Sequence, residues 1–175
     1  MMSTEGGPWS IERRHGVPDW EMDDLASLSL FAGCSITQLA KVLTLGTART
    51  VERGTTLMTQ GDTRREFFVV LGGTARCSVD GRLVALFGPG DFFGDVALLH
   101  RGPRTATVRA EDMLRVLVFS SGEFQRLLSV IPHLSARMLQ IEAERLRASN
   151  ELISALSAVT DPAGATHAPA CEGGP

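Results

Sequence analysis

Cysteine is scarce in this 175-residue chain, and its scarcity excludes several kinds of site. The three cysteines are Cys34, Cys77 and Cys171. They are too few and too scattered along the sequence for a disulfide framework, a zinc site or an iron–sulfur cluster. A chain without disulfides fits a reducing compartment, so we expect a cytoplasmic location.

Long apolar runs and an excess of positive charge are also missing. No segment approaches the ~20 apolar residues that a spanning helix needs, so we expect no membrane insertion. Residues 1–18 lack the apolar core of a signal peptide. The formal net charge is −3. The bulk surface therefore does not attract nucleic acid, and a bound anion would have to be held by local groups.

Histidines and nucleophiles do not cluster as they do in an enzyme. The histidines are widely separated, and none falls on an expected strand: His15, His100, His133 and His167. An oxygenase of the cupin type needs clustered histidine and carboxylate ligands on the strands of its barrel. No nucleophile–base arrangement is visible either. We therefore expect no catalytic residue and no metal site.

The chain does contain a series of short alternating segments separated by glycine-bearing turns. Period-two alternation predicts strands over residues 47–52, 55–59, 66–71, 74–79, 82–87, 105–110 and 114–119. The Asp80-Gly81 dipeptide predicts a two-residue hairpin with both residues at positive φ. Evenly spaced short strands of this kind indicate an antiparallel barrel or jelly roll.

Helical spacing flanks the strands on both sides. Residues 20–30 and 35–45 predict N-terminal helices, and Ser35 can cap the second of them. Its expected apolar face contains Ile36, Leu39, Ala40 and Leu43. After the strands, residues 122–130 and 132–158 predict two C-terminal helices, with a break at Pro132.

The last predicted helix carries an apolar stripe. Leu139, Leu146 and Ile153 recur every seven residues, interrupted by Glu142 and Ser149. The stripe fits packing on the helix's own barrel or a coiled-coil contact in a homodimer about equally well. Residues 21–158 are expected to form one domain, between disordered segments at 1–20 and 159–175. The last segment is too short and too rich in proline and glycine for a helix-turn-helix.

The most informative stretch runs from Phe92 to Thr107 and reads FFGDVALLHRGPRTAT. Gly94 permits a close approach of the backbone and opens a short apolar turn. The first N–H groups of such a turn have no intrahelical acceptor and form an anion site. Arg104 adds the planar donors and the permanent charge that suit a phosphate oxygen. By the residues alone, a surface loop with a solvated Arg104 fits about as well.

This stretch resembles the phosphate-binding cassette of the cyclic nucleotide-binding domain family. That pattern usually reads Phe-Gly-Glu, an apolar residue, Ala-Leu-Leu, three variable residues, Pro-Arg, a small residue, and Ala-Thr or Ala-Ser. The chain departs from it at one position, where Asp95 replaces the glutamate. The resemblance extends over residues 25–156, most closely to the domains of bacterial cyclic-nucleotide-gated potassium channels and to catabolite-activator-type regulators. It implies an α+β fold, an eight-stranded antiparallel β-roll (jelly roll) flanked by N-terminal helices and two C-terminal helices.

The resemblance also implies roles for individual residues. Arg104 would pair with the cyclic phosphate, to which backbone N–H groups of the cassette also donate: Gly94, Asp95, Val96, Ala97 and Leu98. Asp95 would accept from the ribose 2′-hydroxyl, and Thr105 would donate to the phosphate or contact the purine. Arg145 stands where related channel-type domains place an arginine that caps the base, although a solvated Arg145 fits as well.

The sequence thus predicts a stand-alone regulatory sensor that binds cAMP or cGMP, uses no cofactor, and signals by movement of its C-terminal helix. Its output would pass to an effector protein, to a channel or to a second copy. The alternative is a degenerate domain that binds no ligand and acts as a protein-interaction module. The intact Gly94 and Arg104 count against that alternative, and Asp95 counts for it.

Overall fold

A computed structural model of the chain describes residues 22–100 and 102–160. It divides into two compact units, one ending at Leu134 and the other beginning at Ser135. Disorder was predicted for residues 1–20 and 159–175, the latter with Cys171; all of these lie outside the described residues except 159 and 160, which belong to the last helix. The two units are described in turn.

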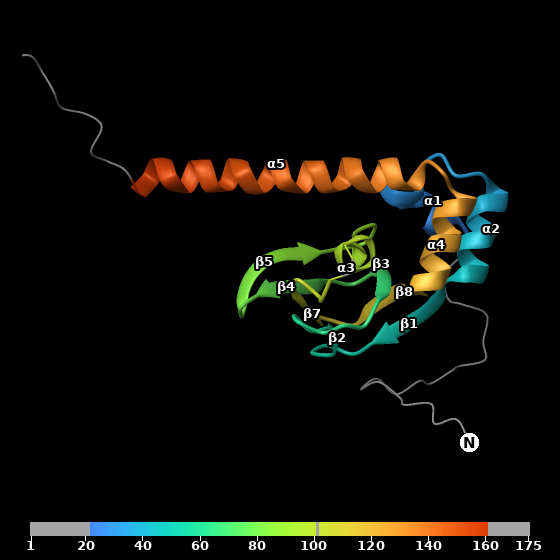
Figure 1. The fold of residues 1–175 in the computed structure, drawn as a ribbon, viewed down its shortest axis with the longest axis horizontal. Helices are drawn as coiled ribbons and strands as arrows, with labels where there is room; N and C mark the ends of the chain where they lie inside the picture. Colours follow the sequence, from blue (N-terminus) through green and yellow to red (C-terminus); the bar gives the residue numbers. More distant parts are fainter. Residues whose placement is uncertain (1–21, 101, 161–175) are drawn as a thin grey trace, which may run out of the picture. The chain divides into compact units, whose positions relative to one another are not determined.

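Strands of the first unit form an antiparallel jelly roll (Figure 1). Among the described residues there are eight: β1 Thr47–Val51, β2 Thr56–Met58, β3 Glu66–Gly72, β4 Ala75–Val79, β5 Arg82–Phe87, β6 Phe92–Phe93, β7 Thr107–Ala110 and β8 Leu114–Ser120. They form two four-stranded sheets, in the orders β1-β8-β3-β6 and β2-β7-β4-β5. The predicted fold class is confirmed. The predicted hairpin is also confirmed, with φ of 50° at Asp80 and 77° at Gly81.

Apart from boundary shifts of a single residue, the strands differ from the sequence prediction in two places. Alternation did not indicate β6, which has only two residues and pairs with β3 through Phe93 and Phe92. The strand predicted from Thr105 begins at Thr107 instead. The backbone of Arg104 pairs with the loop between β2 and β3, because its N–H donates to Asp62 O and its carbonyl accepts from Gly61 N, both over 2.8 Å. That pairing holds the chain away from the ladder until Thr107.

The core lies between the two sheets and is closed by side chains from both. It contains Phe68 and Val70 of β3, Cys77 of β4, Val108 of β7 and Val116 of β8. The Phe68 and Phe93 rings stack at 4.8 Å between centroids. Burial of such apolar surface contributes roughly 25 cal/mol per Å².

Strand β3 is buried on both faces, which explains its unbroken apolar sequence. Phe68 points into the barrel, whereas Phe67 packs on the opposite face against Phe124, with ring centroids 4.6 Å apart. Phe124 belongs to helix α4, Ser121–Val130. Strand β3, which begins at Glu66, is therefore packed between the core on one face and helix α4 on the other.

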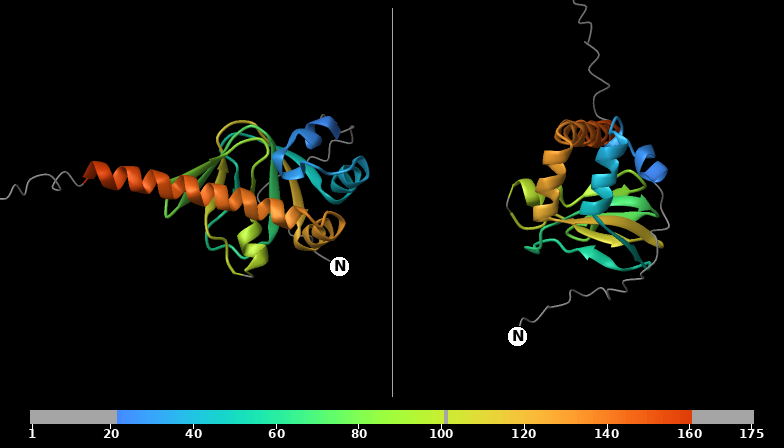
Figure 2. Two further views of the ribbon diagram at one scale, coloured as in Figure 1. Left: turned by 90° about the horizontal axis from the view of Figure 1, so that it is seen from above. Right: turned by 90° about the vertical axis from the view of Figure 1, so that its right-hand side faces the viewer.

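Helices at one end of the barrel cover that outer face. They are α1 Met22–Ser27, the 3-10 turn η1 Ser29–Phe31, α2 Ile36–Leu45 and α4. Helices α2 and α4 stand side by side in both views of Figure 2, and Gln38 Nε2 donates to Val130 O over 3.2 Å. Ser35 caps α2 as predicted, accepting from Gln38 N. The predicted apolar face is wrong at Ile36, which is 74% exposed, because α4 covers the side of α2 that carries Leu39 and Val42.

The second unit contains one long helix, α5, Leu134–Thr160, of which only Leu134 belongs to the first unit. The predicted break at Pro132 is found, since α4 ends at Val130 and α5 starts at Leu134. Along α5, Leu139, Leu146 and Ile153 are more than 60% exposed. What covers this stripe stays a prediction. Within the described part of the chain, no helix is both long and apolar enough to span a bilayer.

Candidate functional site

The cassette begins at a tight turn that joins it to β3. Gly90 has φ of 91° and donates through its N–H to Val70 O, while Asp91 O accepts from Val70 N. The Asp91 carboxylate accepts from Gly88 N over 2.8 Å and closes the turn. The chain that follows, β6, is thereby held against a buried strand.

Gly94 lies where no other residue fits. It has φ of 90° and precedes the five-residue helix α3, Asp95–Leu99. A Cβ at this position would lie 2.5 Å from Glu66 O and 2.8 Å from Arg104 Nη1. Both the left-handed backbone and the lack of space require glycine. The Arg104 guanidinium can lie close to the start of α3 only because position 94 is a glycine.

Arg104 is a buried charge, with an exposed fraction of 3%. Its Nη1 donates to Gly94 O over 2.9 Å. Its Nη2 donates to Glu66 O over 2.8 Å and to Glu66 Oε2 over 3.0 Å. Burial lowers the pKa of the guanidinium and the Glu66 carboxylate opposes that shift. An arginine stays protonated at neutral pH in either case. The alternative interpretation, a surface loop with a solvated Arg104, is therefore wrong.

Glu66 is a site residue that the sequence did not indicate. It is the first residue of β3 and lies 38 positions from Arg104 in the chain. Its side chain is 29% exposed, whereas that of Arg104 is 2% exposed. A buried arginine requires an anionic or carbonyl partner, but that rule does not say which carboxylate of the chain supplies it.

The loop between β2 and β3, residues 59–65, supports Arg104 from the other side. Arg64 Nε donates to Asp62 Oδ2 over 2.7 Å, which lowers the pKa of the Asp62 carboxyl. Gln60 exchanges two hydrogen bonds of 2.9 Å with Asp80 at the tip of the β4–β5 hairpin. The loop thus ties the backbone of Arg104 to a hairpin that is distant in the sequence.

Comparisons with known proteins show the family to which this domain belongs. The sequence model of the family described as the cyclic nucleotide-binding domain matches residues 48–130, a range that contains the whole cassette. The chain belongs to the cyclic nucleotide-binding domain family.

Individual relatives of this cyclic nucleotide-binding domain are regulatory proteins and channels. A "cAMP-dependent protein kinase regulatory subunit" of Yarrowia lipolytica is 36% identical over 72% of the chain and 37% of its own length. A "putative potassium channel protein" of Rhodopseudomonas palustris is 30% identical over 75% of the chain and 32% of its own length. The chain thus spans well under half of these curated relatives.

Solved structures agree with this assignment. The structure described as "Sp-2Cl-cAMPS bound to PKAR CBD2" is 27% identical and has a TM-score of 0.63. The match covers 75% of this chain and 88% of that one. The cyclic nucleotide-binding domain described above therefore has the fold of a protein that was solved with a cAMP analogue.

The structure brings most of the predicted site residues of the domain together. Asp95, Ala97 and Leu98 are buried in and around α3, whereas Val96 is 46% exposed. Thr105 is exposed and lies outside β7. These residues, with Gly94 and Arg104, all lie between positions 94 and 105, in the first unit. Their roles toward a ligand stay predictions.

Arg145 is placed elsewhere, on α5 in the second unit. Its Nη1 donates to Glu142 Oε1 over 2.6 Å, one turn earlier on the same helix. Its role as a cap on the base would need the two units to act together and stays a prediction.

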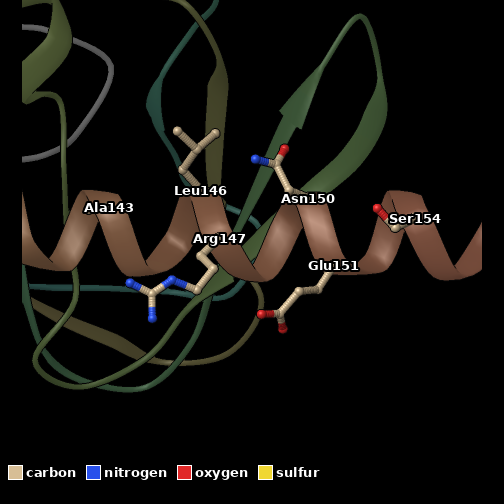
Figure 3. Close-up of a pocket in the computed structure, with 6 residues that line it drawn as sticks. All are labelled: Ala143, Leu146, Arg147, Asn150, Glu151 and Ser154. Carbon is tan, nitrogen blue, oxygen red and sulfur yellow. The ribbon is translucent and has the colours of Figure 1, made fainter.

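A surface hollow also lies on α5 (Figure 3). It is lined by Ala143, Leu146, Arg147, Asn150, Glu151 and Ser154. All of these residues belong to one helix, so the hollow has no second wall and makes a poor candidate for a binding site. Residues 22–100 and 102–160 also contain no group of three or more histidine, cysteine, aspartate or glutamate side chains that could hold a metal ion.

Proposed function

We propose that this domain binds a purine cyclic nucleotide, cAMP or cGMP, through the segment from Gly94 to Thr105, and that it acts as a non-catalytic regulatory sensor. The observation that carries the proposal is the buried guanidinium of Arg104, held at the start of α3 by a glycine that no other residue can replace. A buried cation beside helical N–H groups matches the charge and the acceptors of a cyclic phosphate.

The roles proposed for the other cassette residues follow from their chemistry. Backbone N–H groups of Gly94, Asp95, Val96, Ala97 and Leu98 would donate to the phosphate oxygens. The Asp95 carboxylate would accept from the ribose 2′-hydroxyl. Because aspartate is one methylene shorter than glutamate, a water molecule can bridge the remaining distance at little enthalpic cost.

The output of the sensor would be a movement of α5. Arg145 on that helix would cap the base, and the break at residues 131–133 supplies a joint at which the helix can turn. The effector would be another protein, a channel, or a second copy that contacts the stripe of Leu139, Leu146 and Ile153. Light scattering of the purified chain distinguishes a homodimer from a monomer.

Thermal-shift measurements with cAMP and cGMP at micromolar and millimolar concentrations test the proposed ligand. A ligand that binds only the folded state raises the melting temperature as its concentration increases. At a hundred times Kd it adds about 2.7 kcal/mol to the free energy of unfolding. We expect a concentration-dependent rise with both nucleotides and none with adenosine, which lacks the phosphate.

The second candidate function is a domain that has lost its ligand and acts as a protein-interaction module. Two observations favour it. Asp95 stands in place of the usual glutamate, and the Arg104 guanidinium already donates a hydrogen bond to the Glu66 carboxylate. A melting temperature that does not change with either nucleotide at millimolar concentration would support this second function.

A further inference from the structure

Arg104 is already engaged by an anion that belongs to the protein. An arginine guanidinium offers two forks of paired donors, Nη1 with Nη2 and Nε with Nη2, so Nη2 takes part in both. Here Nη2 donates twice to Glu66, to the backbone carbonyl over 2.8 Å and to the carboxylate over 3.0 Å. A phosphate that is to be held by either fork must therefore share or replace a bond to Glu66.

The charges lead to the same conclusion. Arg104 contributes one positive charge in a site where its side chain is 2% exposed, and Glu66 already balances it. A cyclic phosphate would bring a second negative charge to the same nitrogen. Like charges repel strongly where water is largely excluded. The carboxylate and the phosphate thus compete for Arg104.

The two contacts with Glu66 differ in how easily they can break. The carbonyl is part of β3, which is fixed between the core and α4, and Glu66 pairs with Ser120 of β8. The carboxylate is on a 29% exposed side chain at the very start of that strand. It can turn toward solvent while the carbonyl still anchors the guanidinium.

We propose that Glu66 is an affinity-determining residue. Its carboxylate acts as an internal anion that holds Arg104 in the empty domain and is displaced by the phosphate of the ligand. This inference rests on the proposed function, because it concerns the same site and the same class of ligand. The inference predicts that the Glu66 carboxylate raises the Kd for the cyclic nucleotide. The domain therefore responds at higher ligand concentrations than it would with an uncharged side chain at position 66.

The test is the substitution Glu66→Gln, studied by calorimetric titration with cAMP and with cGMP. Glutamine keeps the shape, the backbone carbonyl and a side-chain acceptor; it removes the charge and replaces one carboxylate oxygen by an NH2 group. Hydrogen bonds to charged groups are roughly twice as strong as neutral ones, so we expect Kd to fall by about five- to tenfold for both nucleotides.

The matched control is Glu111→Gln, which removes the carboxylate of another arginine–glutamate pair, Arg76–Glu111, outside the cassette. That variant should bind with the parent's affinity. Glu66→Asp supplies a second variant should the glutamine protein not fold. It retains the charge but shortens the reach, and we expect Kd to fall by about two- to threefold as the contact with Nη2 weakens.

Each outcome separates this inference from the proposed function. Tighter binding by the Glu66 variants supports both. A parent that binds, with variants that bind equally or more weakly, overturns the inference and leaves the function standing, because Glu66 would then only orient Arg104. Binding by Glu66→Gln but not by the parent supports the competition and overturns the sensor function. If neither protein binds a cyclic nucleotide, both are wrong.

Discussion

Arg104 combines a permanent positive charge with an exposed fraction of 3%, and its environment shows how the chain maintains that charge. Two backbone carbonyls and one carboxylate accept from it. A buried arginine is costly unless each such partner is in place. The residues that position it, Gly94 and Glu66, are therefore as much part of the site as the arginine itself.

Replacement of Arg104 by alanine should weaken cyclic nucleotide binding by at least about tenfold, because a charge-assisted hydrogen bond is worth roughly 1.5–3 kcal/mol. Arg104→Lys should recover little of this loss, since an ammonium group cannot form the forked contact. Calorimetric titration measures both effects. Arg109→Ala is the control, as Arg109 is an exposed arginine on β7 that donates to Gly54 O. Unchanged affinity in Arg104→Ala would contradict the cassette assignment.

Thr105 is the residue expected to bear on the choice of purine. It is exposed and precedes β7, so it is not part of the strand that the sequence predicted from residue 105. A threonine hydroxyl can accept a hydrogen bond from the exocyclic amino group of guanine, which adenine lacks at that position.

We expect both cAMP and cGMP to bind, and we expect Thr105→Ala to weaken cGMP binding more than cAMP binding. The difference should be at most about tenfold, the value of one neutral hydrogen bond. Competition titrations on the parent and the variant measure it. Equal losses for the two nucleotides, or no binding of cGMP, would show that Thr105 does not read the base.

At the level of secondary-structure elements, the break between α4 and α5 is the feature on which the proposed movement of α5 depends. Helix α4 is anchored through Phe124 and Leu127, both fully buried, and by a capping box at Ser120. Helix α5 starts after Pro132 and carries large apolar side chains that are exposed. A fixed helix followed by a break is the arrangement that a moving terminal helix requires.

Hydrogen exchange in the presence and absence of cAMP tests whether α5 responds to the ligand. We expect amides of residues 135–146 to become more protected when the ligand binds, because exchange reports local opening. Amides of β8, which is paired on both sides within its sheet, serve as the internal control and should not change. Identical protection of residues 135–146 in both states would contradict a role of α5 in the output.

At the level of the whole molecule, the proposed attraction for a cyclic phosphate has to be local. The formal net charge is −3, so the molecule as a whole repels a cyclic nucleotide slightly. In the proposed site the buried positive charge is that of Arg104, which is paired with the Glu66 carboxylate. The chain also spans only 37% and 32% of the two curated relatives described above.

The sequence by itself determined those features that depend on neighbouring residues. Alternating residues between glycine turns predicted most strands, and Asp80-Gly81 predicted a hairpin whose φ values the structure confirms. The serine cap of α2 and the break at Pro132 were predicted for the same reason. Gly94 and Arg104 could be recognised because the cassette is one short uninterrupted segment.

Only the tertiary structure decided which residues from distant segments meet. The two-residue strand β6 forms because its backbone pairs with the edge of β3. Thr105 is outside β7 because the backbone of Arg104 is hydrogen-bonded to the loop at residues 59–65. The partnership of Glu66 and Arg104 joins positions 38 residues apart. No local preference specifies such a pair, because it arises from the path of the barrel and from the free energy cost of leaving a buried charge unpaired.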